Sequence, residues 1–189
     1  MEISQHHAVQ FYKDAKSLAG TVAGFLREGL NIGEPAIIVA TSVHAAAITS
    51  ELSALGVDVP ALRATGELQI LDARKLLSAF MIGNRPDALM FRSNVGDLIE
   101  RLCSGRQPCP IRVYGEMVDL LWQEGNTEGA IRLEILWNQL ASAYDFSLLC
   151  GYAVGHFYKE TAREASGTRE GTGIDAVCRQ HSHVISAIN

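Results

Sequence analysis

Glu116 is the acidic residue best placed for chemistry, because it closes residues 110–116, whose apolar pattern predicts a β-strand. Ligands of parallel α/β sheets bind beyond the carboxyl ends of strands, so this carboxylate can line a ligand pocket. It can equally cap the helix predicted from Met117, since helix N-termini favour acidic groups. Strand alternation puts Arg112, Tyr114 and Glu116 on one face, which places Arg112 within reach of Glu116. The sequence leaves the pocket and capping interpretations open.

A second pair of polar residues lies on the helix predicted after its cap Asn126. Glu134 and Asn138 are one helical turn apart, so they share a face and can bond each other or a common partner. Trp137 lies between them, and Trp122 precedes the helix. The two tryptophans either wall a pocket or fill the core, and we favour the core because large aromatic side chains dominate protein interiors.

Histidines and cysteines do not form a complete metal-binding motif. His6 and His7 are adjacent on an extended segment and point to opposite sides, and Cys178 with His181 supplies only half of a zinc set. We therefore predict no metal and no cofactor. Cys150 lies in an apolar strand and is expected to be a small buried hydrophobe rather than a nucleophile. Without a GxSxG or comparable motif, we predict no catalytic residue and no enzyme activity.

The loop after the apolar run 36–40 lacks the residues of a phosphate-binding loop. It contains Thr41, Ser42 and His44, with neither the lysine nor the glycines of the GxxxxGK[ST] motif. The N-terminus of the helix that follows can hold an anion weakly through its free N–H groups. Nucleoside triphosphate hydrolysis is accordingly disfavoured.

The predicted elements alternate along the chain. Short apolar runs predict strands at 36–40, 68–71, 110–116 and 146–152, and helical spacing predicts helices at 14–30, 44–55, 73–81 and 86–102, with Pro86 in a first turn. The alternation is typical of an α/β fold with a mostly parallel central sheet and helices on both faces. The chain from His156 onward is expected to be helical. Residues 165–173 are expected to form a flexible loop, followed by a short docked helix and a frayed end.

Composition narrows the function classes. The chain has 189 residues, 48% hydrophobic residues and a mean hydropathy of +0.10, which excludes disorder as the main state. A net charge of −5 disfavours nucleic acid and anionic lipid as direct partners. No run is apolar enough for a membrane helix, and the beginning of the sequence lacks the pattern of a signal peptide. Four scattered cysteines without a CxxC pair are typical of the reducing cytoplasm, where we expect the protein.

The order of several motifs resembles the MEDS family, a sensory domain of methanogens and methylotrophs named after the regulator of dichloromethane metabolism. The matching positions are His7, Phe11-Tyr12, Gly29-Leu30, Gly33-Glu34, Gly66, Arg112, Gly115-Glu116, Glu134, Asn138, Leu149-Cys150-Gly151-Tyr152, Phe157 and His181. The resemblance implies a degenerate relative of the KaiC and RecA ATPase fold, a three-layer sandwich that lacks the P-loop. It also implies a module that senses small hydrocarbon derivatives and often works with histidine kinase or DNA-binding domains.

Together these observations predict a noncatalytic sensory domain over residues 1–164, followed by the loop and tail over 165–189. The expected ligand is a small organic molecule, and the expected ligand-binding residues are Glu116, Arg112, Tyr152, His7, Tyr12, Glu134 and Asn138. The signal would pass to a separate partner such as a histidine kinase or a transcription regulator, or through homo-oligomerisation. Two alternatives stay open: a protein-interaction or partner-switching regulator with a vestigial nucleotide site, and a degenerate nucleotide-binding protein related to ATPases.

Overall fold

The computed structural model describes residues 7–155 and 173–186 of the chain. The predicted boundary after Glu164, most of the predicted loop that follows it, the helix predicted from His156, and the motif residue Phe157 lie outside these ranges. His6 also lies outside them.

Six strands form one sheet in the order β3-β2-β6-β7-β1-β8, and every neighbouring pair is parallel. The strands are β1 (His7–Tyr12), β2 (Ala36–Ala40), β3 (Leu68–Asp72), β6 (Ile111–Gly115), β7 (Phe146–Ala153) and β8 (His183–Ser186). A separate two-stranded antiparallel hairpin joins β4 (Met81–Ile82) to β5 (Arg85–Pro86). The parallel sheet confirms the predicted α/β class. β1 lies between β7 and β8, so the first described strand is bordered by the last two.

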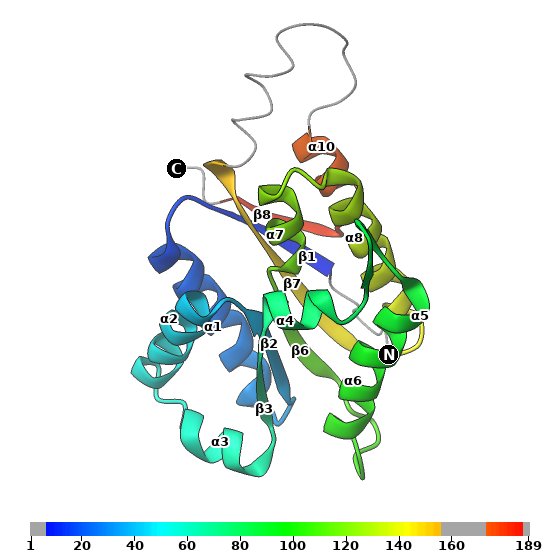
Figure 1. The fold of residues 1–189 in the computed structure, drawn as a ribbon. Helices are drawn as coiled ribbons and strands as arrows, with labels where there is room; N and C mark the ends of the chain where they lie inside the picture. Colours follow the sequence, from blue (N-terminus) through cyan, green and yellow to red (C-terminus); the bar gives the residue numbers. More distant parts are fainter. Residues whose placement is uncertain (1–6, 156–172, 187–189) are drawn as a thin grey trace, which may run out of the picture.

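Helices cover both faces of the sheet (Figure 1). One face carries α1 (Ala15–Leu30), α2 (Ser42–Ala54) and α3 (Val59–Thr65). The other carries α4 (Ala73–Ser78), α5 (Ala88–Phe91), the π-helical turn η1 (Arg92–Gly96), α6 (Asp97–Leu102), α7 (Met117–Gln123), α8 (Thr127–Ala141) and α10 (Gly173–Cys178). Within the described ranges, no single helix is long and apolar enough to cross a membrane, and the pair α2–α3 passes that test only with a bend of 112°.

The alternation of side chains along each strand divides the core between the two faces. In β7, Cys150 and Tyr152 join the apolar core beneath α7 and α8, whereas Leu149 joins the core beneath α1 and α2. Trp122 and Trp137 are both buried in the first of these cores, as the core interpretation predicts, and Trp137 also forms part of a pocket wall, as the alternative predicts. All five residues of β2 are buried, as expected for a strand covered on both faces.

Capping groups start the helices close to the predicted positions. Asp14 precedes α1 and accepts a hydrogen bond from the Ser17 N–H at 2.8 Å. Asn126 caps α8 in the same way, because its Oδ1 accepts the Gly129 N–H at 2.9 Å. The helical periodicity and the polar cap together therefore sufficed to predict both helices.

Three local predictions are wrong. The helix predicted to reach Met81 ends at Ser78, because the chain turns there into the β4–β5 hairpin. Pro86 belongs to that hairpin, and the next helix begins after Asp87, whose carboxylate accepts the Met90 N–H. The tail is only half helical, since residues 183–186 form β8 beside β1. β8 is too short for its alternation to stand out in the sequence.

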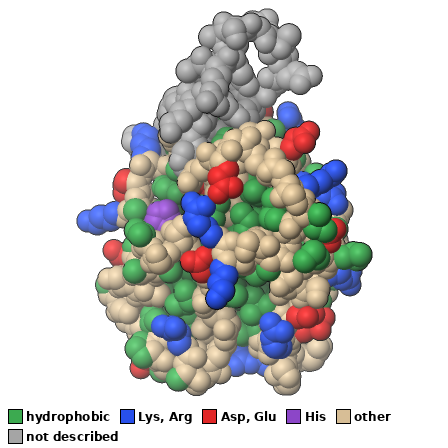
Figure 2. Space-filling view, viewed as in Figure 1, with side chains coloured by type: hydrophobic (Ala, Val, Ile, Leu, Met, Phe, Trp, Pro, Cys, Tyr) green, Lys and Arg blue, Asp and Glu red, His purple; other side chains and the backbone are tan. Residues whose placement is uncertain are grey.

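A disulfide joins Cys103 and Cys109, which are six residues apart. The spacing had not suggested this pair, since we had interpreted the cysteines as unpaired residues of a reducing compartment. Cys150 and Cys178 are free. On the face of the molecule seen in Figure 2, acidic and basic side chains are interspersed with hydrophobic ones, so this face carries no broad basic surface.

Candidate functional sites on two faces of the sheet

Glu116 lies at the carboxyl end of β6 and is almost fully buried. Its carboxylate accepts hydrogen bonds from the backbone N–H of Thr41, from Nδ1 of His44 at 2.6 Å and from the Tyr114 hydroxyl at 3.0 Å. Thr41 follows β2, the strand next to β6, so the carboxyl ends of two neighbouring strands meet here. The Tyr114 hydroxyl can approach because residue 151 is a glycine. A Cβ at that position would collide with the hydroxyl.

Of the two interpretations left open for Glu116, the cap of α7 is wrong. Glu116 precedes α7 in the chain, but its side chain makes no capping hydrogen bond to that helix. The carboxylate instead turns across the sheet edge and accepts the N–H of Thr41, the residue that precedes α2. It therefore occupies the position at the start of α2 where an anion would be held.

His44 connects Glu116 to a second acidic group. The hydrogen bond that His44 donates to Glu116 raises the pKa of His44, although burial acts in the opposite direction. The ring of Tyr12 stands edge-on to His44, and its hydroxyl donates to Asp119 at 3.4 Å. Burial and the two nearby carboxylates raise the pKa of Tyr12. The result is a polar cluster with two acids, a histidine and two tyrosines, which we call the carboxyl-edge cluster: Tyr12, His44, Tyr114, Glu116 and Asp119.

Arg112 does not join this cluster, so the predicted contact with Glu116 is wrong. Arg112 lies near the opposite end of β6, where its Nε donates to Glu34 at 2.7 Å. Its guanidinium also lies over the ring of Phe25, 5.0 Å from the ring centroid. Sharing a strand face did not bring Arg112 and Glu116 together, because the arginine has a partner in the loop before β2. Gly29 packs directly against this ion pair.

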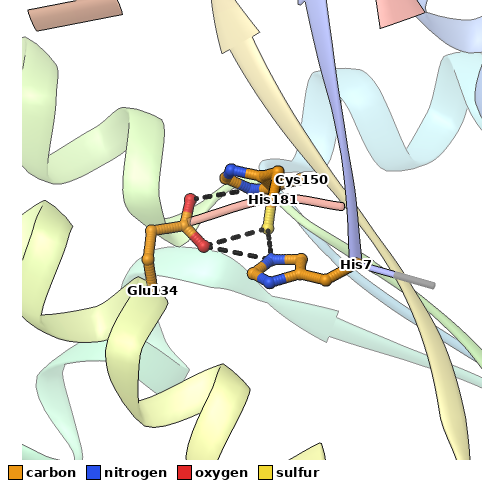
Figure 3. Close-up of side chains that lie close together, drawn as sticks. All are labelled: His7, Glu134, Cys150 and His181. Atoms are coloured by element: carbon orange, nitrogen blue, oxygen red, sulfur yellow. Dashed lines mark hydrogen bonds and ion pairs between the residues drawn. The ribbon is translucent and has the colours of Figure 1, made fainter. Parts of the chain in front are cut away.

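A second cluster lies on the other face, beneath α8. His7 from β1, Glu134 from α8, Cys150 from β7 and His181 from the turn before β8 point toward one another (Figure 3). We call these four residues the His7 cluster. Glu134 is fully buried and also accepts a hydrogen bond from the Tyr152 hydroxyl at 2.9 Å.

Of the two possibilities left open for Glu134 and Asn138, bonding each other or a common partner, the structure has the second, and the partner is His7. Its Nε2 lies 3.1 Å from Glu134 Oε2, and its Nδ1 lies 2.8 Å from Asn138 Oδ1. The amide nitrogen of Asn138 donates to the Gln180 carbonyl at 3.1 Å. Asn138 thus joins the imidazole of β1 to the segment before β8.

The environment of Glu134 keeps its carboxylate ionised. Burial alone would raise the pKa, but the neighbouring His181 and His7 hold the pKa of Glu134 well below its usual range. Burial opposes charge on His181, yet the Glu134 carboxylate raises the pKa of His181. Burial and the same carboxylate raise the pKa of the Cys150 thiol well above its ordinary value.

A pocket of about 280 Å³ opens beside the His7 cluster. Its apolar wall includes Trp137 and Phe146, and its polar groups include His7, Asn138 and Gln180. His7 and Phe146 begin β1 and β7, so the pocket lies at the amino ends of these strands. We had expected a ligand at the carboxyl ends.

The seven residues predicted to bind a ligand are thus divided between three places. Glu116 and Tyr12 lie in the carboxyl-edge cluster, and Arg112 lies at the other end of β6, paired with Glu34. The remaining four gather around the His7 cluster: His7, Glu134, Asn138 and Tyr152.

Sequence reasoning missed several members of the two clusters. Asp119 is a single acid within the apolar run 117–122, a pattern that marks a buried carboxylate with partners. His44 carried no signal beyond following a strand by four residues. Cys150 and His181 come together only because β8 pairs with β1, and that pairing was not predicted.

The family comparison gives a further finding. The model of the MEDS family, described as the methanogen/methylotroph, DcmR sensory domain, matches residues 6–169. Among curated proteins, none matches this sequence. The family match covers most of the chain, including β1 to β7 and both clusters except His181. The chain therefore belongs to the MEDS family of sensory domains.

Proposed function

We propose that this chain is a noncatalytic sensory domain that binds a small organic molecule and relays its presence to a separate protein. The observation that carries the proposal is the pocket beside the His7 cluster, which combines an apolar wall at Trp137 and Phe146 with polar groups at His7 and Asn138. Small-molecule sites combine apolar walls with polar groups that fix orientation, and in this pocket polar and charged groups, Arg179 and Ser182 among them, outnumber the apolar ones. Membership of a sensory family supports the same role.

The size and lining of the pocket favour a small hydrocarbon derivative. Its volume of about 280 Å³ is close to the lower limit of roughly 300 Å³ for ligand sites, so it suits a molecule with few atoms. Trp137 and Ala141 would contact the apolar part of the ligand, and Asn138 or Gln180 would bond one polar group. The ligand would then lie against α8 and the segment that leads into β8.

The noncatalytic part of the proposal rests on the most reactive side chain near the pocket. Cys150 is fully buried, and its raised pKa keeps it protonated at neutral pH. Nucleophilic cysteines need the opposite, a thiolate in an accessible and electropositive setting.

A separate surface supports the alternative of a protein-interaction module. Leu89 is 81% exposed, and Ile82 and Met90 nearby in the chain are also exposed. They lie on the β4–β5 hairpin and α5, where large apolar side chains are costly to leave in water unless a partner covers them. We propose a cytoplasmic histidine kinase or transcription regulator as the class of partner, and the same surface serves the relay in the sensory proposal.

The alternative of a nucleotide-binding protein is weakened by Glu116. In a P-loop protein the phosphates lie at the start of the helix that follows the strand. Here the N–H of Thr41 at the start of α2 is bonded to the Glu116 carboxylate. A phosphate at this position would meet a buried negative charge and no lysine.

The experiment that tests the sensory proposal is ligand-observed NMR with a panel of small hydrocarbon derivatives: a halomethane, an alcohol, an amine and a thioether. We expect at least one to bind saturably to the natural sequence. Ala141→Phe would fill the pocket and abolish binding, whereas Ala143→Phe, two residues along and outside this pocket, would preserve it. Equal binding by both variants would contradict the proposed site, and no binding by the natural sequence would contradict the ligand class.

A further inference from the structure

The four side chains of the His7 cluster come from four separate parts of the fold. The ligating atoms of His7, Glu134, Cys150 and His181 all lie within 4.8 Å of one another (Figure 3). Three of the residues are buried, and the side chain of His181 has no exposed surface. Two imidazoles, one thiol and one carboxylate make up a donor set that zinc binds readily in proteins.

The distances between these atoms match a tetrahedral coordination shell. A zinc ion with bonds of about 2.0–2.3 Å holds neighbouring ligand atoms about 3.3–3.7 Å apart. In the cluster, His7 Nε2 lies 3.3 Å from Cys150 Sγ and 3.1 Å from Glu134 Oε2. Cys150 Sγ lies 3.6 Å from the same oxygen, and His181 Nε2 lies 3.3 Å from Oε1 of Glu134. Three of the six edges of the tetrahedron are therefore near these values. His181 faces the other carboxylate oxygen, and the ligand atoms lie within 4.8 Å of one another, so its ring must move inward to close the shell on one ion.

Hydrogen bonds outside the cluster orient both imidazoles for coordination. Nδ1 of His181 lies 2.8 Å from the Val177 carbonyl, an acceptor, so this nitrogen carries the proton. Nδ1 of His7 faces Asn138 Oδ1, whose identity is fixed because the amide nitrogen donates to Gln180. In the neutral imidazoles, each Nε2 then directs a lone pair into the cluster. Metal-binding histidines typically donate their other N–H to a carbonyl in this way.

His181 supplies an independent sign that a group is expected between the four residues. Its Nε2 is buried 3.3 Å from Glu134 Oε1, an ion-pair contact that lacks the geometry of a well-formed hydrogen bond. A buried polar atom without a hydrogen bond costs free energy, so such atoms are uncommon in folded proteins. A metal ion at the centre would satisfy this nitrogen and the carboxylate together.

We propose that His7, Glu134, Cys150 and His181 bind one zinc ion. On binding, Cys150 loses its proton to solvent, and the thiolate and the carboxylate balance the charge of Zn²⁺. Four protein ligands complete a closed shell, which is typical of a structural or regulatory site. His7 and His181 also line the pocket proposed for the organic ligand, but zinc binding needs no organic ligand and is tested without one.

The site would control how the end of the described chain docks on the sheet. His181 is the one ligand that follows residue 172, and it lies between α10 and β8. Coordination would therefore tie α10 and β8 to β1, β7 and α8 through a single ion. Zinc binding would therefore control whether β8, the strand at the edge of the sheet, docks on β1.

The test uses the full chain with any affinity tag removed, stripped of metal by a chelator and returned to buffer at neutral pH. Titration with ZnCl₂ against a chromophoric chelator should give one site per chain, and elemental analysis should confirm the ratio. Replacing zinc with Co²⁺ should produce the thiolate charge-transfer absorption that marks a cobalt–sulfur bond. Absence of stoichiometric zinc binding, or of that absorption, would overturn the proposal.

Variants assign the ligands. Cys150→Ala and His181→Gln should each weaken zinc binding at least 100-fold, and Asn138→Ala should weaken it about 10-fold, since loss of an outer partner costs about 10- to 100-fold. Cys178→Ala and His183→Gln are matched controls, because both residues lie on the same segment and outside the cluster. Equal loss of binding in the controls would place the metal elsewhere and overturn the assignment.

Hydrogen exchange separates the docking effect from a general gain in stability. Zinc should slow exchange of the β8 amides at least 10-fold more than that of the α2 amides, which lie on the opposite face. Uniform protection of both elements would contradict the docking role. Because no organic ligand is present in these assays, failure of the zinc site leaves the sensory proposal to its own test.

Discussion

At the residue scale, two buried carboxylates determine what each face of the sheet can do. Glu116 receives hydrogen bonds from Thr41, His44 and Tyr114, so its charge is well solvated by the protein. Glu134 faces two imidazoles and a thiol, and only Tyr152 and Cys150 are neutral donors to it. Both carboxylates are therefore satisfied by their neighbours, and under the zinc proposal the groups around Glu134 become ligands of one ion.

The pair His44–Glu116 should stabilise the fold mainly at acidic pH. The pKa of His44 is raised in the folded state, so the stabilisation is fully present below the unfolded value of about 6.5 and disappears as pH rises through the folded pKa. Asp119 and Tyr12 are the other groups that face His44, and Asp119 adds to the upward shift.

A double-mutant cycle with His44→Gln and Glu116→Gln tests this pH dependence. Chemical unfolding should give a coupling free energy of about 1 to 2 kcal/mol at pH 5.5 and much less at pH 9. A coupling free energy that grows with pH would contradict the assignment, because it would mean that neutral His44, not protonated His44, interacts favourably with Glu116.

Close packing against the Arg112–Glu34 ion pair explains why residue 29, next to the end of α1, is a glycine. A Cβ at this position would lie 2.6 Å from Glu34 Oε2 and 2.9 Å from Arg112 Nε, so Gly29→Ala would disturb the buried part of this ion pair. We expect a loss of about 1 to 2 kcal/mol in unfolding free energy, measured by urea denaturation. Gly20→Ala in the same helix meets nothing within 4 Å and should stabilise by about 0.5 to 1 kcal/mol. If both substitutions changed the unfolding free energy in the same direction, the packing explanation would be refuted.

How far the sequence predicts the site is also decided at this scale. Glu134 and Asn138 were predictable as a pair, because helical periodicity fixes which residues share a face. Their partner His7 was not, since it comes from a strand 131 residues away from Asn138. Arg112 and Glu116 were predictable as residues on one face of a strand, but not as partners. A shared face fixes the side on which the two side chains lie and leaves open which groups they bond.

At the element scale, the contacts at the starts of α8 and α2 determine where the two clusters lie. Asn126 starts α8, the helix that brings Glu134 and Asn138 to the sheet, and its side chain also donates to Asn84 in the β4–β5 hairpin. The start of α2 is stabilised differently, since Thr41 makes no side-chain cap and Glu116 accepts its N–H instead. These two junctions hold the two clusters in place.

Removal of the buried cap should be costlier than removal of an exposed one. Asn126→Ala loses the bond to Gly129 and leaves the Asn84 carbonyl without this donor, so we expect a loss of about 2 kcal/mol. Asp58→Ala removes an exposed cap of α3 and should cost about 0.5 to 1 kcal/mol. Thermal and urea unfolding measure both, and equal costs would show that burial of the cap has no effect.

The start of α2 should not accept nucleotide. We expect millimolar Mg-ATP to leave the melting temperature unchanged and to undergo no hydrolysis, because the Glu116 carboxylate already occupies the helix N-terminus. Glu116→Gln removes the charge but supplies no lysine, so it should not create binding. Magnesium-dependent turnover that Glu116→Gln abolishes would instead make Glu116 catalytic.

Element prediction succeeded where one interaction dominates and failed where several compete. β2 is buried along its whole length, and its apolar run identified it at once. The end of α4 and the hairpin at Pro86 depend on how residues 79–87 turn back, which local periodicity does not encode. β8 exists because β1 offers it an edge, so its structure is set by a distant strand.

At the scale of the whole molecule, the sheet separates two polar clusters that the chain could use independently. The carboxyl-edge cluster lies toward α1 and α2, and the His7 cluster lies beneath α8 on the opposite face. The α/β class followed from the alternation of strand and helix patterns, because that alternation produces parallel pairs. The order of strands in the sheet could not be predicted, since hydrophobic periodicity does not indicate which strands become neighbours.

The place of β1 in the sheet has a consequence for how the chain is made. Of the described strands, β1 is synthesised before the others and its neighbours β7 and β8 after them, and contacts from His7 span 143 residues to Cys150 and 175 to Ser182. Val9 and Phe11 therefore stay without their sheet partners until β7 and β8 leave the ribosome. Such long-range parallel pairing closes slowly, so a newly made chain would present β1 to chaperones for longer than any other strand. Pulse-labelled hydrogen exchange during refolding should show the amides of β2 and β6 protected before those of β1, and the reverse order would mean that the ends of the fold meet first.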